Sequence, residues 1–482
     1  MFRCITKPIE NVIKVIKECY NYFQYFSSLY YFLKYKDTKY SNKYLAYLDK
    51  SIYNCGPIGV KLIQLLIMYD GVLPISYINK LKYTLENCKV HSWKNTEDLY
   101  YANFGTHIYD DYNLINTTDD YNKCIVGSGS IGQVYKLYSK ELQKYVAVKV
   151  KHPSVDYEIK RFVSTATFIM KYFSYITVIP YRNIINIFID NINIQNDFIR
   201  EACNTRKLRD NFKDDTHIII PEVYDVNNNF IIMSYHAGTD INSISNKSLK
   251  YSIYNDMNFL TLSSIMVHDF MHADLHDGNW KIQVHEDNTY NIIIYDCGLV
   301  VSTNNLQFNQ EVLITFLTGN FKNFVTILMN SSSMTNIDNS NLHKLETHVD
   351  KICSDSSLDS GDRACNIIKY AIDNNIINSS EHINLLLSYI MTLTIGKINA
   401  LRIQKVINIP SNDVDVGVIF NLYNGLLDKM KKYTKLHDFF SAYINTHKDI
   451  HELYNIWLHD KFGHNDSSII IDIIYNYIQM IM

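Results

Sequence analysis

A glycine-rich turn between two strand-like stretches constrains the fold of this chain more than any other part of it. Gly127, Gly129, Gly132 and Val134 match the pattern Gly-x-Gly-x-x-Gly-x-Val. In a dinucleotide-binding fold such a turn opens a helix, whereas residues 133–137 have the composition of a continuing strand. The pattern therefore predicts a β-hairpin with a glycine loop, and it argues against a Rossmann unit.

A lysine follows at the end of the next apolar strand. Residues 145–150 have the sequence Tyr-Val-Ala-Val-Lys-Val, and Lys149 is the seventeenth residue after Gly132. Glycines let a loop fold tightly over phosphates and present backbone N–H donors, while a lysine supplies a point charge for phosphate oxygens. A lone glycine pattern is weak evidence because glycine-rich hairpins are common. Joined to Val-Ala-Val-Lys at this distance, it indicates a nucleotide phosphate site.

A second set of polar residues lies further along the chain. Asn279 is five residues after Asp274, the separation at which a kinase catalytic loop places a metal-binding amide after a proton-accepting carboxylate. Asp296 follows an isoleucine-rich run and opens an Asp-x-Gly turn, so it fits a second metal ligand. Alone, an Asp with a nearby Asn is more often structural. With the upstream loop and lysine, we interpret Asp274 as catalytic and Asn279 and Asp296 as Mg2+ ligands.

A helix expected over residues 181–212 supplies an acidic partner for Lys149. Asp197 and Glu201 are four residues apart and should share one face of this helix. A solvated acidic pair is the ordinary interpretation of that spacing. Because a kinase-like lobe needs its lysine oriented by a salt bridge, we predict that Glu201 pairs with Lys149.

Strands, a hinge and a hairpin are expected between these two sets of residues. Apolar runs at residues 218–224 and 230–235 predict two strands around an Asn-rich turn, and residues 233–238 a hinge. Residues 251–270 predict a helix, and residues 280–294 a hairpin turning at 286–288. The residues expected to contact the nucleotide are Val126, Gly127, Ser128, Gly129, Ser130, Ile131, Gly132, Gln133, Val134, Lys149, Met233 and Tyr235.

Length, net charge and cysteine content indicate how many packed units to expect, which partners are disfavoured and which compartment is favoured. With 482 residues the chain is too long for one ordinary core, so two or three packed units are expected. A net charge of −3 gives no field that would recruit nucleic acid, and we expect no such partner. Nine cysteines without a Cys-x-x-Cys pair favour a reducing intracellular compartment. We expect no transmembrane segment and no signal peptide, and a buried helix at residues 468–482.

The two ends of the chain are expected to be helical. An amphipathic helix is predicted at residues 9–35. A second helical segment carries Lys61 and Gln64, three residues apart, and this spacing by itself predicts an exposed polar pair. After Asp296 there is no Ala-Pro-Glu segment, with which a protein kinase docks a peptide, so a protein substrate is disfavoured. Helices are expected instead at residues 310–328, 342–353, 364–372, 383–404 and 416–436.

Four motifs together resemble the UbiB/ADCK (aarF-domain) atypical kinases over roughly residues 53–301. Residues 61–64 resemble the Lys-x-Gly-Gln element of that family, and residues 146–153 its third strand with His-Pro. Residues 201–204 resemble its Glu-Ala-x-Asn helix, and residues 272–279 its His-Ala-Asp-Pro-His-Pro-Gly-Asn loop. The resemblance implies an α+β, two-lobed protein-kinase-like fold with a small β-rich N-lobe and a helical C-lobe. A helical extension would precede the lobes, and a helical region would end the chain.

The resemblance also implies an organisation and an activity. The divisions expected are a helical extension at 1–95, an N-lobe with a helical insert at 96–238, the catalytic part of the C-lobe at 239–335 and its C-terminal helical part at 336–482. The implied cofactors are ATP and Mg2+. The implied activity is that of an atypical kinase or ATPase acting on small-molecule or quinone- and isoprenoid-linked substrates, with a lipid or membrane surface as partner. Lys61, Gln64 and Asp197 are candidate regulatory residues.

The chain departs from the family pattern at several positions while keeping its chemistry. Ile63 replaces the glycine of Lys-x-Gly-Gln, and Gln195 replaces the first acid of a Glu-x-Asp element. The family's Ala-rich loop is Gly-Ser-Gly-Ser here, and Leu275, Asp277 and Cys297 stand at two prolines and a phenylalanine. A decayed pseudokinase usually loses at least one of five polar residues, and all of them are retained: Lys149, Glu201, Asp274, Asn279 and Asp296.

Two alternatives to an active kinase remain open on the sequence. One is a catalytically silent, nucleotide-binding pseudokinase scaffold in which Lys61 and the N-terminal helices cover the nucleotide site. The other is a metal-dependent hydrolase, because His268, His272 and His276 recur every fourth residue and could act as ligands with Asp274. The kinase interpretation is preferred since it also accounts for Asn279 and the glycine loop.

Overall fold

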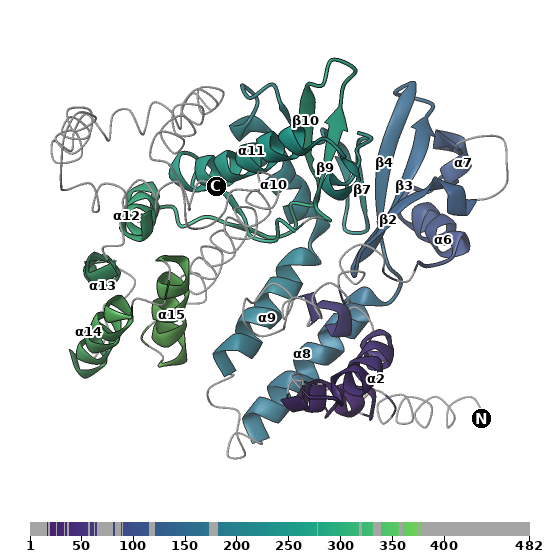
Figure 1. The fold of residues 1–482 in the computed structure, drawn as a ribbon. Helices are drawn as coiled ribbons and strands as arrows, with labels where there is room; N and C mark the ends of the chain where they lie inside the picture. Colours follow the sequence, from purple (N-terminus) through teal and green to yellow (C-terminus); the bar gives the residue numbers. More distant parts are fainter. Residues whose placement is uncertain are drawn as a thin grey trace, which may run out of the picture. The chain divides into compact units, whose positions relative to one another are not determined.

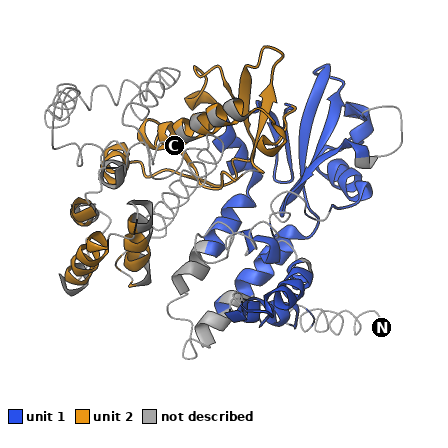
Figure 2. Cartoon of the chain, viewed as in Figure 1, with its two compact units in different colours: residues 1–206, 221–236 blue, residues 207–220, 237–482 orange. Residues whose placement is uncertain are grey.

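The computed structural model divides the chain into two compact units (Figure 2). Unit 1 comprises residues 1–206 and 221–236, and unit 2 comprises residues 207–220 and 237–482. The fourfold division expected from the sequence stays a prediction. The residues described are 17, 20–25, 27–32, 34–35, 38–55, 58–61, 63–64, 81, 88, 90–114, 121–172, 182–276, 278–317, 321–330, 339–355, 358, 360–374 and 376.

The centre of unit 1 is an antiparallel sheet whose strands run in the order β1-β3-β4-β7-β6, with β2 paired to β3 (Figure 1). The glycine-rich stretch forms the predicted hairpin of β2 and β3, and β4 lies in the middle of the sheet between β3 and β7. The strands are β1 (Tyr112–Asn113), β2 (Ile125–Ser128), β3 (Gly132–Ser139), β4 (Lys144–Lys151), β6 (Val223–Val226) and β7 (Phe230–Ser234).

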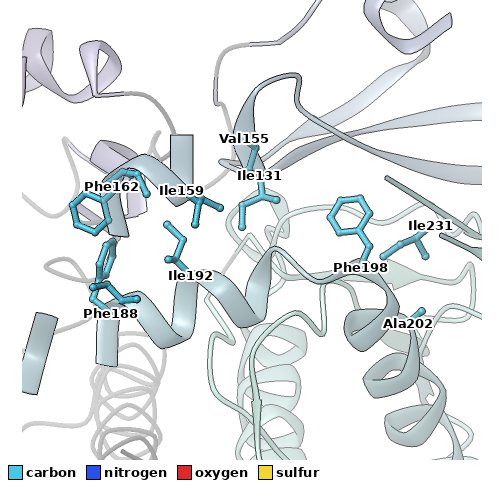
Figure 3. Packing of buried hydrophobic residues seen from close by; sticks show 11 residues of the cluster. Ile131, Val155, Ile159, Phe162, Phe188, Ile192, Phe198, Ala202 and Ile231 are labelled. Atoms are coloured by element: carbon cyan, nitrogen blue, oxygen red, sulfur yellow. The ribbon is translucent and has the colours of Figure 1, made fainter. Parts of the chain in front are cut away.

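Helices pack on both faces of this sheet because its strands alternate their side chains. Tyr100 of α6 (Trp93–Phe104) and Ile108 of α7 (Ile108–Asp111) are buried in one cluster with Val148 and Phe230. The neighbouring residue Ile231 belongs to the other cluster, which joins the glycine loop to three helices (Figure 3). These helices are α8 (Val155–Tyr172), α9 (Arg182–Gln195) and α10 (Phe198–Asn211).

The single helix expected over residues 181–212 is wrong, since α9 and α10 are separate helices. Asp197 stands between them and caps α10, accepting a hydrogen bond from the backbone nitrogen of Arg200 at 3.0 Å. An aspartate at this position satisfies an amide that the first helical turn leaves unpaired. Asp197 is therefore exposed while Glu201 is only 2% exposed, so the two carboxylates do not share one face.

The N-terminal part of unit 1 is helical and has a small core of its own. Tyr25, Phe32 and residues of α2 (Ser41–Asn54) are buried in one cluster with Ile63. The prediction that Lys61 and Gln64 form an exposed polar pair is wrong, since Gln64 is only 4% exposed. Among the described residues of their short helical segment, Ile58, Val60 and Ile63 are buried as well.

Unit 2 carries a three-stranded sheet and a two-stranded one. The predicted hairpin is confirmed as β9 (Trp280–Val284) and β10 (Tyr290–Ile294), and β8 (Met271–His272) pairs with β11 (Val300–Val301). The single strand expected over residues 218–224 is wrong. Its first part, β5 (Ile218–Ile219), pairs with β10, whereas its second part forms β6 in unit 1. Pro221 lies between them and has no N–H to continue a ladder.

The other elements in the described part of unit 2 are mostly helices. The helix before the catalytic-loop candidates is α11 (Lys247–Met266), and a 3₁₀ turn at Ile241–Ser243 precedes it, whereas the 3₁₀ turn at Tyr121–Cys124 belongs to unit 1. After β11 the chain forms α12 (Leu306–Leu317), α13 (Phe321–Asn330), α14 (Asn339–Ser354) and α15 (Ser360–Asp373). The helix expected at 310–328 is thus two helices, and those at 342–353 and 364–372 are confirmed with longer bounds.

Some expectations fall on residues outside the described ranges. These are the start of the helix at 9–35, the helices at 383–404 and 416–436, and the buried helix at 468–482. Within the described part of the chain, no helix has the length and apolar character that crossing a bilayer requires.

Candidate functional site

Lys149 and Glu201 form a buried ion pair in unit 1. Lys149 lies on β4, opposite Val134 of the glycine hairpin and Ile231 of β7, and Glu201 lies in the first turn of α10. The distance between Lys149 Nζ and Glu201 Oε1 is 2.6 Å, and their side chains are 11% and 2% exposed. The structure thus contains the pairing expected from the sequence, across 52 residues of chain.

The ring of Phe198 contacts two of the lysines of β4. Its ring centroid is 5.3 Å from Lys149 Nζ and 5.1 Å from Lys151 Nζ, within the range of a cation–π contact. Lys151 also donates to the carbonyl oxygen of Asn196 at 2.8 Å. The start of α10 is therefore fastened to β4 at two lysines, which fixes the position of Glu201. Sequence reasoning missed Phe198, although its place at the start of the Glu201 helix was visible.

The three glycines of the loop have different physical reasons to be glycine. A Cβ on Gly132 would lie 2.7 Å from the carbonyl oxygen of Val150 and 3.2 Å from Phe198, so the packing of unit 1 excludes a side chain there. A Cβ on Gly127 would meet no atom within 4 Å, and one on Gly129 only the carbonyl of Gly132 at 3.7 Å. Neither has a left-handed φ. The fold alone does not demand glycine at these two positions, whereas close approach of a phosphate would.

The other residues predicted to contact the nucleotide differ in their exposure to solvent. Val126 is 47% exposed, whereas Ile131 belongs to a core cluster and Gln133 is fully buried. Ser128 and Ser130 are buried as well. At the end of β7, Met233 packs partly against the core, and Tyr235 lies under Lys136 with its centroid 4.4 Å from Nζ. Burial raises the pKa of the Tyr235 phenol.

The catalytic-loop candidates of unit 2 are tied to the Asp-x-Gly segment by backbone and side chain. Ala273 N donates to the carbonyl oxygen of Leu299 at 2.9 Å, and Tyr295 N donates to that of Asn279 at 2.8 Å. His272 accepts from Asp274 N at Nδ1, at 3.2 Å, so its other nitrogen, Nε2, carries the hydrogen that is donated to Asp296 O at 2.7 Å. One histidine therefore links the two segments.

Asn279 and Asp296 offer oxygen ligands of the kind that Mg2+ prefers. Asn279 donates from Nδ2 to the carbonyl oxygen of Asp274 at 2.7 Å, which fixes the orientation of its amide and leaves Oδ1 as the end for a cation. Asp296 has a φ of +40°, a left-handed conformation that is costly for a non-glycine residue, and its Oδ1 accepts from Gly298 N at 3.0 Å. The donor set fits a magnesium ion.

The three histidines spaced every fourth residue do not form a metal centre. His272 uses both ring nitrogens on the backbone, and His276 accepts from Gly278 N at Nδ1, at 3.1 Å. His268 lies against Phe212, with ring centroids 5.0 Å apart. Among the residues the structure describes, no group of three or more His, Cys, Asp or Glu side chains is placed to hold a metal. The described part of the structure therefore does not bring together the histidine ligands that a metal-dependent hydrolase would need.

These observations define the class of the protein as protein-kinase-like, with a β-rich unit and a largely helical one. The ABC1 atypical kinase-like domain matches residues 84–328, which is half of the chain. The chain belongs to this family, the UbiB/ADCK family of the resemblance stated above.

Curated relatives agree with this assignment. The ABC1 family protein MCP2 homolog of Schizosaccharomyces pombe is 26% identical over 259 residues, covering 51% of this chain and 45% of that protein. The probable protein kinase UbiB of Histophilus somni is 24% identical over 293 residues, covering 57% and 52%. The probable serine/threonine-protein kinase abkB of Dictyostelium discoideum is 24% identical, covering 53% and 38%. The chain spans about half the length of the curated relatives it matches.

Solved structures with detectable similarity are more distant. The complex of Rv3197 with erythromycin from Mycobacterium tuberculosis has a TM-score of 0.41 and 16% identity, covering 68% of this chain and 87% of that one. The Rio2 kinase complex with ADP, Mg2+ and phosphoaspartate from Chaetomium thermophilum has a TM-score of 0.26 and 12% identity, covering 52% and 76%.

Proposed function

We propose that this protein binds Mg-ATP and transfers or hydrolyses its γ-phosphate. The observation that carries the proposal is the buried pair of Lys149 and Glu201 beside the glycine hairpin. A buried ion pair seldom stabilises a fold relative to apolar side chains, because both charges lose their hydration. A lysine that is held in place by a glutamate is instead suited to bind phosphate oxygens, which is the role we assign to Lys149.

The residues of unit 2 supply the remaining roles in this proposal. Asn279 and Asp296 would hold Mg2+, which when bound neutralises charge on the β- and γ-phosphates. Asp274, only 9% exposed, would accept the proton of the attacking hydroxyl or water. The fixed amide of Asn279 and the link through His272 support this assignment, since both hold ligand groups at defined positions before a metal arrives.

The acceptor in this proposal is a small or lipid-linked molecule and not a peptide. After β11 at Val300–Val301, helix α12 begins at Leu306, so there is little chain between them to form a peptide-docking segment. The quinone and isoprenoid class, and a lipid or membrane surface as partner, follow from family membership alone. They are part of the proposal on that ground.

Substitutions at Asp274 and Lys149 test the proposal. We expect Asp274→Asn to keep stabilisation by Mg-ATP in a thermal-shift assay while phosphate release falls by about 100- to 10,000-fold. Lys149→Met should weaken the stabilisation itself. Equal turnover in wild type and Asp274→Asn would exclude the enzymatic role. Repeating the panel with ADP, GTP, Mn2+ and isoprenoid phenols identifies the nucleotide, the metal and the class of acceptor.

A silent scaffold is the second candidate, and one contact favours it. Ile58 of the N-terminal helical part is buried in the same cluster as Ile131 of the glycine loop. The segment that carries Lys61 and Gln64 is thereby packed near the loop, as a regulatory element would be. The scaffold predicts that Ile58→Ala leaves turnover at zero, while the kinase proposal with N-terminal regulation predicts that turnover rises when this contact is weakened.

A further inference from the structure

A series of hydrogen bonds leads from the segment before the sheet into the glycine loop. Gly129 O lies 3.0 Å from His152 Nε2, and His152 Nδ1 lies 2.7 Å from His91 Nδ1. His91 Nε2 in turn lies 2.9 Å from the hydroxyl oxygen of Thr96 in the first turn of α6. We call the connected residues the histidine chain: Gly129, His152, His91, Thr96, Tyr135 and Gln133.

The acceptor at one end fixes the protons of both imidazoles. A carbonyl oxygen only accepts, so His152 Nε2 carries the hydrogen that is donated to Gly129, and His152 Nδ1 is an acceptor in the neutral ring. His91 Nδ1 must then donate, and His91 Nε2 must accept from the hydroxyl of Thr96. The two histidines are thus held as opposite neutral tautomers.

The hydrogen bonds at the other end of the histidine chain independently require the same donors and acceptors. An amide nitrogen only donates, so Gln133 Nε2 donates to the hydroxyl of Tyr135, which passes its own hydrogen to Thr96 at 2.8 Å. Gln133 Oε1 accepts from the backbone nitrogen of His91 at 2.9 Å. Gln133, Tyr135 and Thr96 are at most 1% exposed, so water does not compete for these bonds.

Adding a proton to either imidazole would break the link between them. Two N–H groups would then face each other at 2.7 Å with no acceptor between them, so the two rings would be pushed apart and the movement of His152 would take its Nε2 away from Gly129 O. Burial, reinforced by His152, lowers the pKa of His91 to about 4, and burial lowers that of His152. Of the groups on neighbouring elements, Tyr135 is neutral because burial raises its pKa, and Lys151 is bonded to Asn196 and Asp156.

We propose that His91 and His152 are positioning residues that hold the glycine loop ready for nucleotide phosphates and release it when the pair is protonated. For its nucleotide this inference rests on the proposed function. Gly129 lies between the two strands of the hairpin, and its own N–H is bonded to Gly132 O at 2.9 Å. The backbone of Cys88 donates to Ser128 O at 2.9 Å, so the loop is held at two adjacent residues, Ser128 by Cys88 and Gly129 by His152.

Two substitutions of His152 separate its two bonds. In His152→Asn the side-chain oxygen replaces Nδ1 and still accepts from His91, but no donor reaches Gly129. In His152→Gln the amide nitrogen replaces Nε2 and still donates to Gly129, but no acceptor remains beside His91. The matched control is His343→Asn, a substitution of an exposed histidine on α14.

Hydrogen exchange of nucleotide-free protein at neutral pH is the first measurement. We expect the peptide containing residues 126–131 to exchange about fivefold faster in His152→Asn, the effect of losing one hydrogen bond. His152→Gln and His343→Asn should match the wild type. Nitrogen-15 NMR of the wild type should show a hydrogen on Nδ1 of His91 and on Nε2 of His152.

Nucleotide affinity as a function of pH is the second measurement. Relative to His343→Asn at each pH, which cancels the titration of ATP itself, His152→Asn should bind Mg-ATP about fivefold more weakly at neutral pH. His152→Gln should bind normally and lose the wild-type weakening at acidic pH. Identical tautomers, or unchanged loop exchange in His152→Asn, would overturn the proposal. Faster exchange with unchanged affinity would also overturn it, whereas absence of binding in every variant would remove only the proposed function and leave the positioning of the loop supported.

Discussion

His272 donates a hydrogen bond from Nε2 to the carbonyl oxygen of Asp296 at 2.7 Å, while its Nδ1 accepts from the backbone of Asp274. The same imidazole thus sets the position of the proposed base and of the proposed metal ligand. Its tautomer is fixed because Nδ1 has an N–H donor as partner. The left-handed backbone of Asp296, with a φ of +40°, needs such support from its surroundings.

Replacing His272 should weaken metal binding without unfolding the protein. In His272→Asn the amide can still accept from Asp274 N, but it cannot reach Asp296. We expect the Mg2+ concentration for half-maximal stabilisation by ATP to rise about 10-fold or more, as for other groups that orient metal ligands. Magnesium titrations in a thermal-shift assay measure this value. An unchanged Mg2+ requirement would show that Asp296 is positioned without His272.

Removing one partner of the Lys149–Glu201 ion pair should greatly reduce the free energy of unfolding, whereas replacing both residues by apolar ones should reduce it little. Glu201→Gln or Lys149→Met alone leaves one buried charge without its partner, which costs about 3 to 5 kcal/mol of unfolding free energy. The double substitution Lys149→Met with Glu201→Leu should recover most of this loss, yet it should not bind ATP. Urea denaturation and thermal shifts give both results. A double variant less stable than either single one would show that the pair itself stabilises the fold.

Alanine substitutions at two glycines of the same loop should differ in their effect on stability. Gly132→Ala places a Cβ 2.7 Å from the carbonyl oxygen of Val150, so we expect a loss of about 1 to 3 kcal/mol in stability. Gly129→Ala meets its nearest atom only at 3.7 Å and should leave stability within about 1 kcal/mol. If phosphates approach the loop, Gly129→Ala should weaken ATP binding. Unchanged ATP affinity in Gly129→Ala would contradict a phosphate-binding role for this loop.

The sequence was sufficient for the parts of the site that depend on short motifs. The hairpin, Val-Ala-Val-Lys and the loop around Asp274 each impose their own local geometry, so the pairing of Lys149 with Glu201 could be expected across 52 residues. Their chemical roles stay predictions. The two-lobed kinase-like fold was expected from the resemblance of four short motifs to the UbiB/ADCK atypical kinases, whereas the glycine pattern alone predicted only the hairpin.

Interactions between distant segments set what the sequence did not predict. The break before α10 depends on a single capping bond from Arg200 N to Asp197, which hydrophobic periodicity does not register. Gln64 is buried together with Ile58, Val60 and Ile63 of its short helical segment, which its spacing from Lys61 does not indicate. His91 and His152 are 61 residues apart, and nothing in either segment alone indicates that the two rings meet.

Stability should fall with acidification in the range where the unfolded chain takes up protons and the folded histidine pair does not. The pKa of His91 falls from its ordinary value near 6.5 to about 4, so below neutral pH the unfolded state binds more protons and becomes favoured. The contribution of the neutral pair is therefore complete above about pH 6.5 and is lost as the pH falls toward about 4. After allowance for partial exposure, we expect on the order of 1 to 2 kcal/mol.

Comparison with a variant that cannot titrate at this position isolates the effect. His91→Gln should be less stable than the wild type at neutral pH, because its amide replaces the ring imperfectly in a buried network. The difference between wild type and His91→Gln should shrink as the pH is lowered from neutrality toward 5, and this change should exceed that in the difference between wild type and His343→Asn. Urea denaturation at three pH values measures both differences. A constant difference for His91→Gln would mean that the folded pair takes up protons as readily as the unfolded chain, which the geometry of two facing Nδ1 atoms opposes.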